Sequence, residues 1–199
     1  MFSSFFNLGR TILLMITLSL LVACDANPVG KGFVATDITG ADFSTSFALT
    51  DHTGKARTMA DFKGKVVLLF FGFTHCPDVC PTTMLDLKNA MKLIGDQADQ
   101  VQVLFVTVDP ERDTQAVLAK FVPSFDSRFI GLRGDMQQTA ETVKNFKIYY
   151  AKVPGNSEND YSIDHSAGMY AFDKQGKARL YLGYGQKAED IASDVQKLL

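Results

Sequence analysis

The sequence is poor in the residues that most often build metal and redox sites. It has only three cysteines and three histidines in 199 residues, and it has no tryptophan. Any metal or redox site must therefore draw on few cysteine and histidine candidates. The sequence also has little net charge, with 20 Lys and Arg against 22 Asp and Glu. That balance excludes the broad basic field of nucleic-acid-binding proteins, and we expect no nucleic-acid partner. With 46% hydrophobic residues, the chain has the size and composition of one globular domain with a full core.

The first 23 residues lack both acidic side chains and an apolar run long enough to cross a membrane. Arg10 is the only charged residue there, and the apolar stretch that follows covers residues 11–21. A membrane-spanning helix needs about 20 such residues. An arginine followed by a short apolar stretch and a small residue is typical of a secretory signal peptide.

This leader ends in Leu21-Val22-Ala23-Cys24, which resembles the bacterial lipobox. The resemblance implies that Cys24 becomes the acylated first residue of the mature protein. The alternative is an ordinary signal peptide, in which case Cys24 would have no role in processing. We therefore predict a lipoprotein signal peptide at residues 1–23, a tether at 24–34 and a folded domain at 35–199. Asp25 resembles the residue that retains lipoproteins in the inner membrane of enteric bacteria. The expected location is the bacterial inner membrane, with the domain facing the periplasm.

Lipidation of Cys24 would leave two free thiols, Cys76 and Cys80, in the stretch FGFTHCPDVCPTT. An exported protein meets an oxidising compartment, where two neighbouring thiols must be protected, used or joined. At this spacing on a helix the Cβ atoms lie about 5–6 Å apart, whereas a disulfide needs about 3.8 Å. The spacing therefore favours a metal and leaves a disulfide accessible, either redox-active or simply structural.

Pro81 suggests where the following helix begins. Proline is welcome at the first helical position, and the residue before it avoids the helical region. We therefore expect Cys80 at the N-cap, where the helix dipole would stabilise its thiolate.

Two thiolates suit Cu(I) or Zn²⁺, but structural zinc usually takes four protein ligands and no further cysteine is at hand. A third ligand would come from His52, His75 or His165. Of these, His165 ends a stretch that we expect to be a loop and could approach the thiols. The residues alone do not choose between a metal and a disulfide.

The remaining pattern predicts strands that alternate with helices, and hence a layered α/β sheet. The expected strands lie at residues 47–49, 66–71, 101–108, 129–132, 165–172 and 178–182, with a hairpin turn at 51–54. The expected helices follow Pro81, cover residues 114–122, begin at a capping box on Asp135, and end the chain around Ile191. Residues 153–164 are rich in turn formers and predict a loop.

Three segments then carry a specific resemblance: FGFTHCPDVCP, VTVDPERDT and YSIDHSAGMYAFD. In this order they are similar to those of the Sco/SenC proteins, and the likeness runs from about Phe47 to the C-terminus. It implies a thioredoxin-like α/β fold, a central mixed sheet flanked by helices, here with an added N-terminal β-hairpin. It also implies Cu(I) and Cu(II) binding by Cys76, Cys80 and His165.

The same resemblance implies a role in assembling the dinuclear copper (CuA) centre of cytochrome c oxidase, with oxidase subunit II or another copper protein as partner. Asp164 and Asp109 fall in the matched segments, and a role behind the ligands is a hypothesis for them. For Asp113 we expect a helix cap.

Other functions remain open beside a copper metallochaperone. Cys76 and Cys80 could instead cycle between dithiol and disulfide as a thiol-disulfide oxidoreductase that reduces a partner's cysteines. The two functions separate at His165, which copper needs and dithiol exchange does not. A copper sensor or scavenger is a further alternative. A peroxidase is disfavoured, because Phe71 and Phe73 stand where peroxiredoxins carry proline and threonine.

Overall fold

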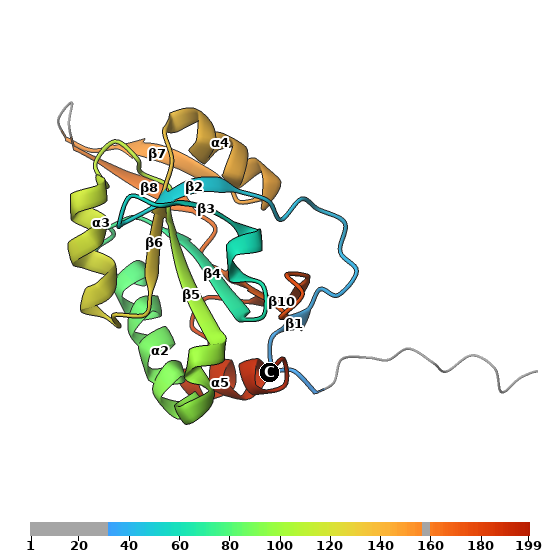
Figure 1. The fold of residues 1–199 in the computed structure, drawn as a ribbon. Helices are drawn as coiled ribbons and strands as arrows, with labels where there is room; N and C mark the ends of the chain where they lie inside the picture. The colour runs from blue at the N-terminus through green and yellow to red at the C-terminus, as the bar shows by residue number, and fades with distance from the viewer. Residues whose placement is uncertain (1–31, 157–159) are drawn as a thin grey trace, which may run out of the picture. The chain divides into compact units, whose positions relative to one another are not determined.

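The computed structural model describes residues 32–156 and 160–199 (Figure 1). The predicted signal peptide, Cys24 and most of the predicted tether lie outside the described residues, so those assignments stay predictions. The strands described are Thr36–Asp37 (β1), Ala48–Asp51 (β2), Ala56–Thr58 (β3), Val66–Gly72 (β4), Val101–Thr107 (β5), Ile130–Arg133 (β6), Tyr150–Pro154 (β7), Tyr161–His165 (β8), Met169–Phe172 (β9) and Ala178–Leu182 (β10).

Eight of these strands form one mixed sheet in the order β1-β10-β9-β4-β5-β6-β2-β3. Strands β4, β5 and β6 run parallel, and the neighbours on both sides join antiparallel. The centre is fixed by β4 and β5, because every residue of both strands is buried. Such continuous apolar runs are typical of parallel strands covered on both faces, as the sequence predicted.

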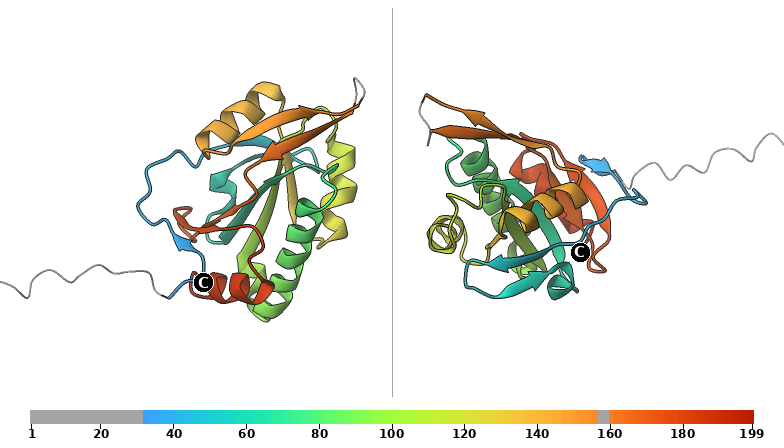
Figure 2. Two further views of the ribbon diagram at one scale, coloured as in Figure 1. Left: turned by 180° about the vertical axis from the view of Figure 1, so that it is seen from behind. Right: turned by 90° about the horizontal axis from the view of Figure 1, so that it is seen from above.

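The helices cover both faces of this sheet. The helical segments are Met59–Phe62 (η1), Val79–Ile94 (α2), Gly95–Gln100 (η2), Gln115–Phe121 (α3), Val122–Ser124 (η3), Met136–Asn145 (α4) and Ala188–Gln196 (α5). Helices α2 and α5 pack against each other on one face, and α4 lies on the opposite face (Figure 2). Phe71 of β4 meets Phe146, the C-cap of α4, with ring centroids 5.4 Å apart. No described helix is both long and apolar enough to cross a membrane.

The predicted hairpin before β4 is confirmed as β2 and β3, which pair antiparallel. Asp51 secures its turn: its carboxylate accepts hydrogen bonds from Thr53, Lys55 and Arg57. The capping box on Asp135 is confirmed, and so is the closing pair of strands as β9–β10, although its first strand begins at Met169 rather than at His165.

The loop prediction for residues 153–164 was wrong at both ends. Strand β7 continues to Pro154 and β8 begins at Tyr161, and the two form a separate antiparallel ribbon. Pro154 fits a strand here because Pro154 and Tyr161 face each other without exchanging hydrogen bonds. The next pair along the ribbon is hydrogen-bonded, since the Gly155 N–H donates to the Asp160 carbonyl. Hydrogen-bonded and non-hydrogen-bonded pairs alternate in an antiparallel ribbon, so the pair that contains Pro154 needs no N–H donor. His165 is therefore the last residue of a strand rather than the end of a loop.

The expected start of α2 was also wrong. The helix begins at Val79 with Asp78 as N-cap, so Cys80 and Pro81 lie inside its first turn. Proline is tolerated there because the first four N–H groups of a helix have no intrahelical partner.

Asp113 is not a helix cap either. The cap of α3 is its neighbour Thr114, whose side chain accepts a hydrogen bond from the Val117 N–H.

Candidate metal centre

The two cysteines lie where β4 gives way to α2. The Cys76 N–H donates to the Phe73 carbonyl in a turn after the strand, and Cys76 remains partly exposed. Cys80 is buried in the first turn of α2. Its backbone N–H donates to the Cys76 sulfur at 3.4 Å, which holds the first thiol beside the helix start.

The protein environment opposes ionisation of Cys80. Burial raises the pKa of the Cys80 thiol far above its ordinary value. The expected thiolate at the helix N-cap was therefore wrong, because desolvation outweighs the dipole at a residue inside the first turn. In the metal-free protein, Cys80 is a protonated thiol.

His165 brings the third donor to Cys80. Its Nε2 lies 3.8 Å from the Cys80 sulfur, and its Nδ1–H donates to the Ser166 carbonyl at 2.9 Å. That bond fixes the tautomer, so the lone pair of Nε2 points at the thiol. Burial lowers the pKa of His165 and so favours the neutral ring that a metal ligand requires. Edge-on contacts from Phe70 and Phe73 hold the ring in place.

This spacing fits a shared metal. With metal–sulfur and metal–nitrogen bonds of about 2.3 and 2.0 Å, a trigonal site places the two donors about 3.7 Å apart. Nonetheless, no three Cys, His, Asp or Glu side chains in residues 32–156 and 160–199 are already grouped around one point. Cys80 and His165 are in place, and Cys76 must turn its sulfur towards them to complete a Cys₂His set.

The other two histidines have different contacts. His52 Nδ1 accepts a hydrogen bond from the Gly131 N–H at 3.0 Å, which fastens the hairpin to β6. His75 has a side chain that is 53% exposed and lies with Nδ1 3.8 Å from Asp113. Of the three candidates, only His165 is brought to the thiols.

A pocket of about 260 Å³ opens beside these donors. Its walls come from the cysteine loop and from β8, and they are largely apolar, with Phe73, Val79 and Ile163 among them. Cys76 and His165 both reach it. Asp164 lines the pocket as an exposed carboxylate and raises the pKa of His165 against the larger effect of burial. The partner that holds the His165 ring is the Ser166 carbonyl, so a role for Asp164 behind the ligand stays a hypothesis.

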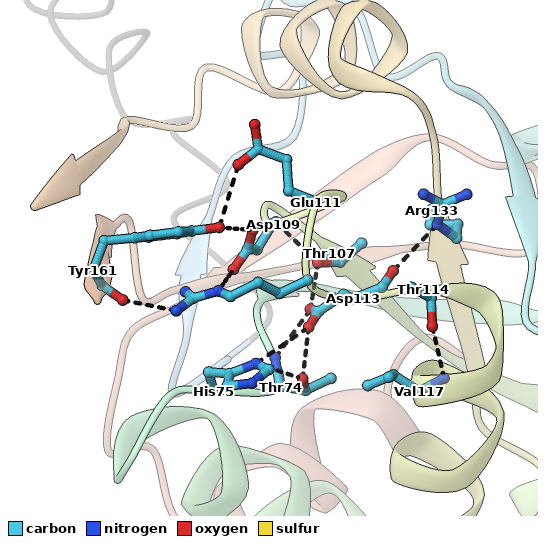
Figure 3. Close-up of polar contacts among 11 residues, drawn as sticks. Thr74, His75, Thr107, Asp109, Glu111, Asp113, Thr114, Val117, Arg133 and Tyr161 are labelled. Atoms are coloured by element: carbon cyan, nitrogen blue, oxygen red, sulfur yellow. Dashed lines mark hydrogen bonds and ion pairs between the residues drawn. The ribbon is translucent and has the colours of Figure 1, made fainter. Parts of the chain in front are cut away.

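The loop after β5 contributes Asp109, for which the sequence suggested a role behind the ligands, and Arg112, to which it assigned none (Figure 3). Asp109 is buried and accepts hydrogen bonds from Arg112 and from the Tyr161 hydroxyl. Asp113, equally buried, accepts two from Thr74 in the cysteine loop. The signal available in the sequence was the segment VTVDPERDT, which contains Arg112 as well as both aspartates.

Comparison with known proteins agrees with this architecture. The chain is 39% identical over 153 residues to "Protein SCO2 homolog, mitochondrial" of Mus musculus, a match that covers 76% of this chain and 60% of the relative. The chain thus spans about half to three fifths of the length of the mitochondrial relatives that it matches.

Two solved structures share the fold. The structure of Bradyrhizobium japonicum ScoI with copper bound superposes with a TM-score of 0.74 at 39% identity, covering 79% of this chain and all of that one. BsSco, described with a disulfide switch as a member of the Sco family of cytochrome c oxidase assembly proteins, gives 0.62 at 23% identity, over 83% and 96% of the chains. At that identity the second match speaks for the fold alone.

A mixed sheet flanked by helices, with a dithiol between its central strand and first long helix, defines the class as thioredoxin-like. The SCO1/SenC family profile matches residues 35–199, and the chain belongs to the SCO1/SenC family.

Proposed function

We propose that this protein is a copper chaperone that holds copper through Cys76, Cys80 and His165. It would help to assemble the dinuclear copper (CuA) centre of cytochrome c oxidase, with subunit II as recipient. The observation that carries the proposal is the His165 ring, which is held by the Ser166 carbonyl and points Nε2 at the Cys80 sulfur from 3.8 Å. The copper-bound Bradyrhizobium relative supports the choice of metal.

The donor set suits a copper cargo. Thiolate sulfur is a soft ligand for Cu(I), and imidazole also accommodates Cu(II), so one site can hold both oxidation states. Because the metal-free Cys80 is a protonated thiol, copper must displace a proton to bind. Three protein donors would leave one coordination position of the copper open to a ligand from the recipient protein. That ligand could reach the copper through the pocket beside Cys76 and His165.

A thiol-disulfide oxidoreductase is the second candidate, and one contact favours it. The Cys80 N–H at 3.4 Å would stabilise a thiolate on Cys76, the more exposed of the two sulfurs. That thiolate would attack a partner disulfide and release one partner thiolate. Cys80 would then attack the mixed disulfide, so that the partner leaves as a dithiol and Cys76–Cys80 becomes the disulfide.

We further propose that the protein is anchored in the bacterial inner membrane by lipid on Cys24, with its domain in the periplasm. The support is the lipobox-like sequence that ends at Cys24. Cells fed labelled palmitate should label the wild-type chain and not a Cys24→Ser variant. Equal labelling of the wild type and the variant would contradict a lipid anchor on Cys24.

A copper titration separates the two functions. Reduced residues 25–199 would be titrated with Cu(II), following the thiolate-to-copper absorption band and the bound copper, for the wild type, His165→Ala and a His75→Ala control. The chaperone predicts one copper per chain and a band that is lost or strongly altered only in His165→Ala. Simple thiol oxidation by copper, identical in all three proteins, would contradict the metal site and leave the dithiol as a reductase pair.

A further inference from the structure

The ribbon that carries His165 is not part of the main sheet. Among the strands of residues 32–156 and 160–199, β7 and β8 pair only with each other, so no strand pairing described there ties them to the eight-stranded sheet. An isolated two-stranded ribbon is marginally stable in water. The place of His165 at the end of β8 must therefore be fixed by contacts from outside the ribbon.

Ile163 of β8 packs into the core, and several polar contacts gather on Tyr161, at the opposite end of β8 from His165 (Figure 3). Its hydroxyl donates to Asp109 at 2.8 Å, and its carbonyl accepts from Arg112 at 2.8 Å. The Arg112 guanidinium also lies over the Tyr161 ring, 3.6 Å from the centroid. Asp109 completes the group by accepting from Arg112 Nε. One buried carboxylate and one guanidinium thus hold the backbone, ring and hydroxyl of a single residue.

The same loop holds the cysteine side of the site. We call residues 108–114, between β5 and α3, the bracket loop. Its Asp113 accepts from the Thr74 N–H at 3.0 Å and from the Thr74 hydroxyl at 2.6 Å. Thr74 lies two residues before Cys76. Asp113 is itself secured to β5 by the Thr107 hydroxyl at 2.6 Å.

A third contact runs through the aromatic ring between the two halves. The Arg112 guanidinium lies 5.9 Å from the centre of the Phe73 ring. Phe73 in turn meets the His165 ring edge-on, with centroids 5.9 Å apart. The bracket loop therefore contacts β8, which carries His165, and the cysteine loop, which carries Cys76. It also contacts the Phe73 ring, which lies against His165.

We propose that the bracket loop sets the spacing between Cys80 and His165, with Asp109, Arg112 and Asp113 as positioning residues and Tyr161 as their point of grip on β8. This inference rests on the proposed function, since it assigns these residues to the same metal site. None of them binds the metal. They act by holding the histidine ribbon and the cysteine loop in one geometry, as residues behind metal ligands commonly do.

The variant Tyr161→Phe tests the grip by removing one hydroxyl while keeping the ring. Tyr150→Phe is the matched control, because the Tyr150 hydroxyl has no hydrogen bond to any residue in the described part of the chain. The first measurement is amide hydrogen exchange in the whole, copper-free chain in detergent. Asp164 and Ser166 sit at the hydrogen-bonded positions of the ribbon, and their amides should exchange faster in Tyr161→Phe than in the wild type or in Tyr150→Phe.

The second measurement is Cu(I) affinity by competition with a chelator. Losing the grip should weaken binding by about 10–100-fold, as for other residues behind metal ligands. Arg112→Lys should do the same, because an ammonium cannot reproduce the guanidinium fork that joins Asp109 to the Tyr161 carbonyl. Asp194→Ala, which removes the contact between α5 and the segment that leads into β1, controls for a general loss of stability.

The outcomes distinguish the two proposals. Unchanged exchange and affinity in Tyr161→Phe would overturn the bracket, as would an equal loss of affinity in Asp194→Ala. If the wild type failed to bind copper, the proposed function would fall. Faster exchange confined to the Tyr161 and Arg112 variants would then still support the bracket as the device that holds β8.

Discussion

At the scale of single residues, Cys80 lies in an environment that opposes the negative charge that the proposed copper site requires of it. Its sulfur is buried, faces a neutral imidazole and has a raised pKa. The free energy of metal–thiolate bond formation must therefore also offset the free energy of deprotonating Cys80. This makes copper binding at the site depend on pH in a direction that can be worked out.

The affinity for Cu(I) should rise with pH between 6 and 9. Because the pKa of Cys80 lies above this range, each bound copper releases the proton of this thiol. One released proton corresponds to about a tenfold gain in affinity per pH unit, and any proton that Cys76 also releases on binding makes the rise steeper. Burial lowers the pKa of His165, which favours the neutral imidazole and weakens proton competition at this ligand. Chelator competition at several pH values measures the slope, and a flat profile would show a preformed thiolate.

Gly72 leaves the room that the Cys80 sulfur occupies. A Cβ at this position would lie 2.9 Å from that sulfur and 2.9 Å from the Phe105 ring. Gly72→Ala should therefore lower the free energy of unfolding by about 1–3 kcal/mol and weaken the copper–thiolate band, because Cys80 is pushed from its place. Gly183→Ala is the control, since a Cβ there would meet no atom within 4 Å. Urea unfolding and absorption spectra would show whether the two variants differ.

At the scale of elements, the hairpin β2–β3 depends on one buried carboxylate. Burial raises the pKa of Asp51, but the hydrogen bonds from Thr53, Arg57 and Lys55 outweigh it and hold the pKa well below its usual range. The ionised form is thus favoured in the folded state. Its contribution is fully present above the unfolded pKa of about 4 and is lost as the pH falls below that value.

Asp51→Asn should therefore destabilise the protein by about 2–4 kcal/mol at pH 7, since it leaves the Arg57 charge without its partner. The difference from the wild type should shrink as the pH falls below about 4. Asp42→Asn, at an exposed position, should change little. Urea unfolding at pH 7 and pH 3 checks both statements, and an equal difference at the two pH values would contradict them.

Elements with a continuous apolar pattern could be predicted from the sequence, and those held by distant partners could not. The strands β4 and β5 follow from runs of buried residues, and α4 from a local capping box. The ribbon β7–β8 was missed because residues that usually form turns also occupy the ends of its strands. The end of β8 is held by Arg112 and Asp109, about fifty residues away in the chain.

The same distinction applies to the candidate site. The cysteine pair and His165 could be named from motifs, and the structure places His165 beside Cys80. The protonation of Cys80 could not be predicted, because it depends on burial. The grip on Tyr161 could not either, because no local pattern records which side chains meet across the fold.

At the scale of the whole molecule, the described fold is closed by a contact between its two ends. Asp194 of α5 is buried, and its carboxylate accepts from the backbone N–H groups of Val34 and Ala35. This contact marks where the folded unit begins, beside the predicted end of the tether at residue 34.

Asp194→Ala should release the chain around residues 33–37 and lower the free energy of unfolding by about 1.5–3 kcal/mol. Limited proteolysis should then cut near Phe33 faster than in the wild type, with the copper band unchanged. Glu189→Ala, on the exposed part of the same helix, is the control. Equal cutting of both variants and the wild type would show that Asp194 does not hold this segment.

The proposed copper site is defined by its three ligands, Cys76, Cys80 and His165. The most direct measurement is X-ray absorption at the copper edge of Cu(I)-loaded protein, wild type against His165→Ala. We predict two sulfur neighbours at about 2.3 Å and one imidazole nitrogen at about 2.0 Å in the wild type, with the nitrogen lost in the variant. Identical spectra for the two proteins, or a wild-type spectrum without imidazole, would contradict the Cys₂His centre.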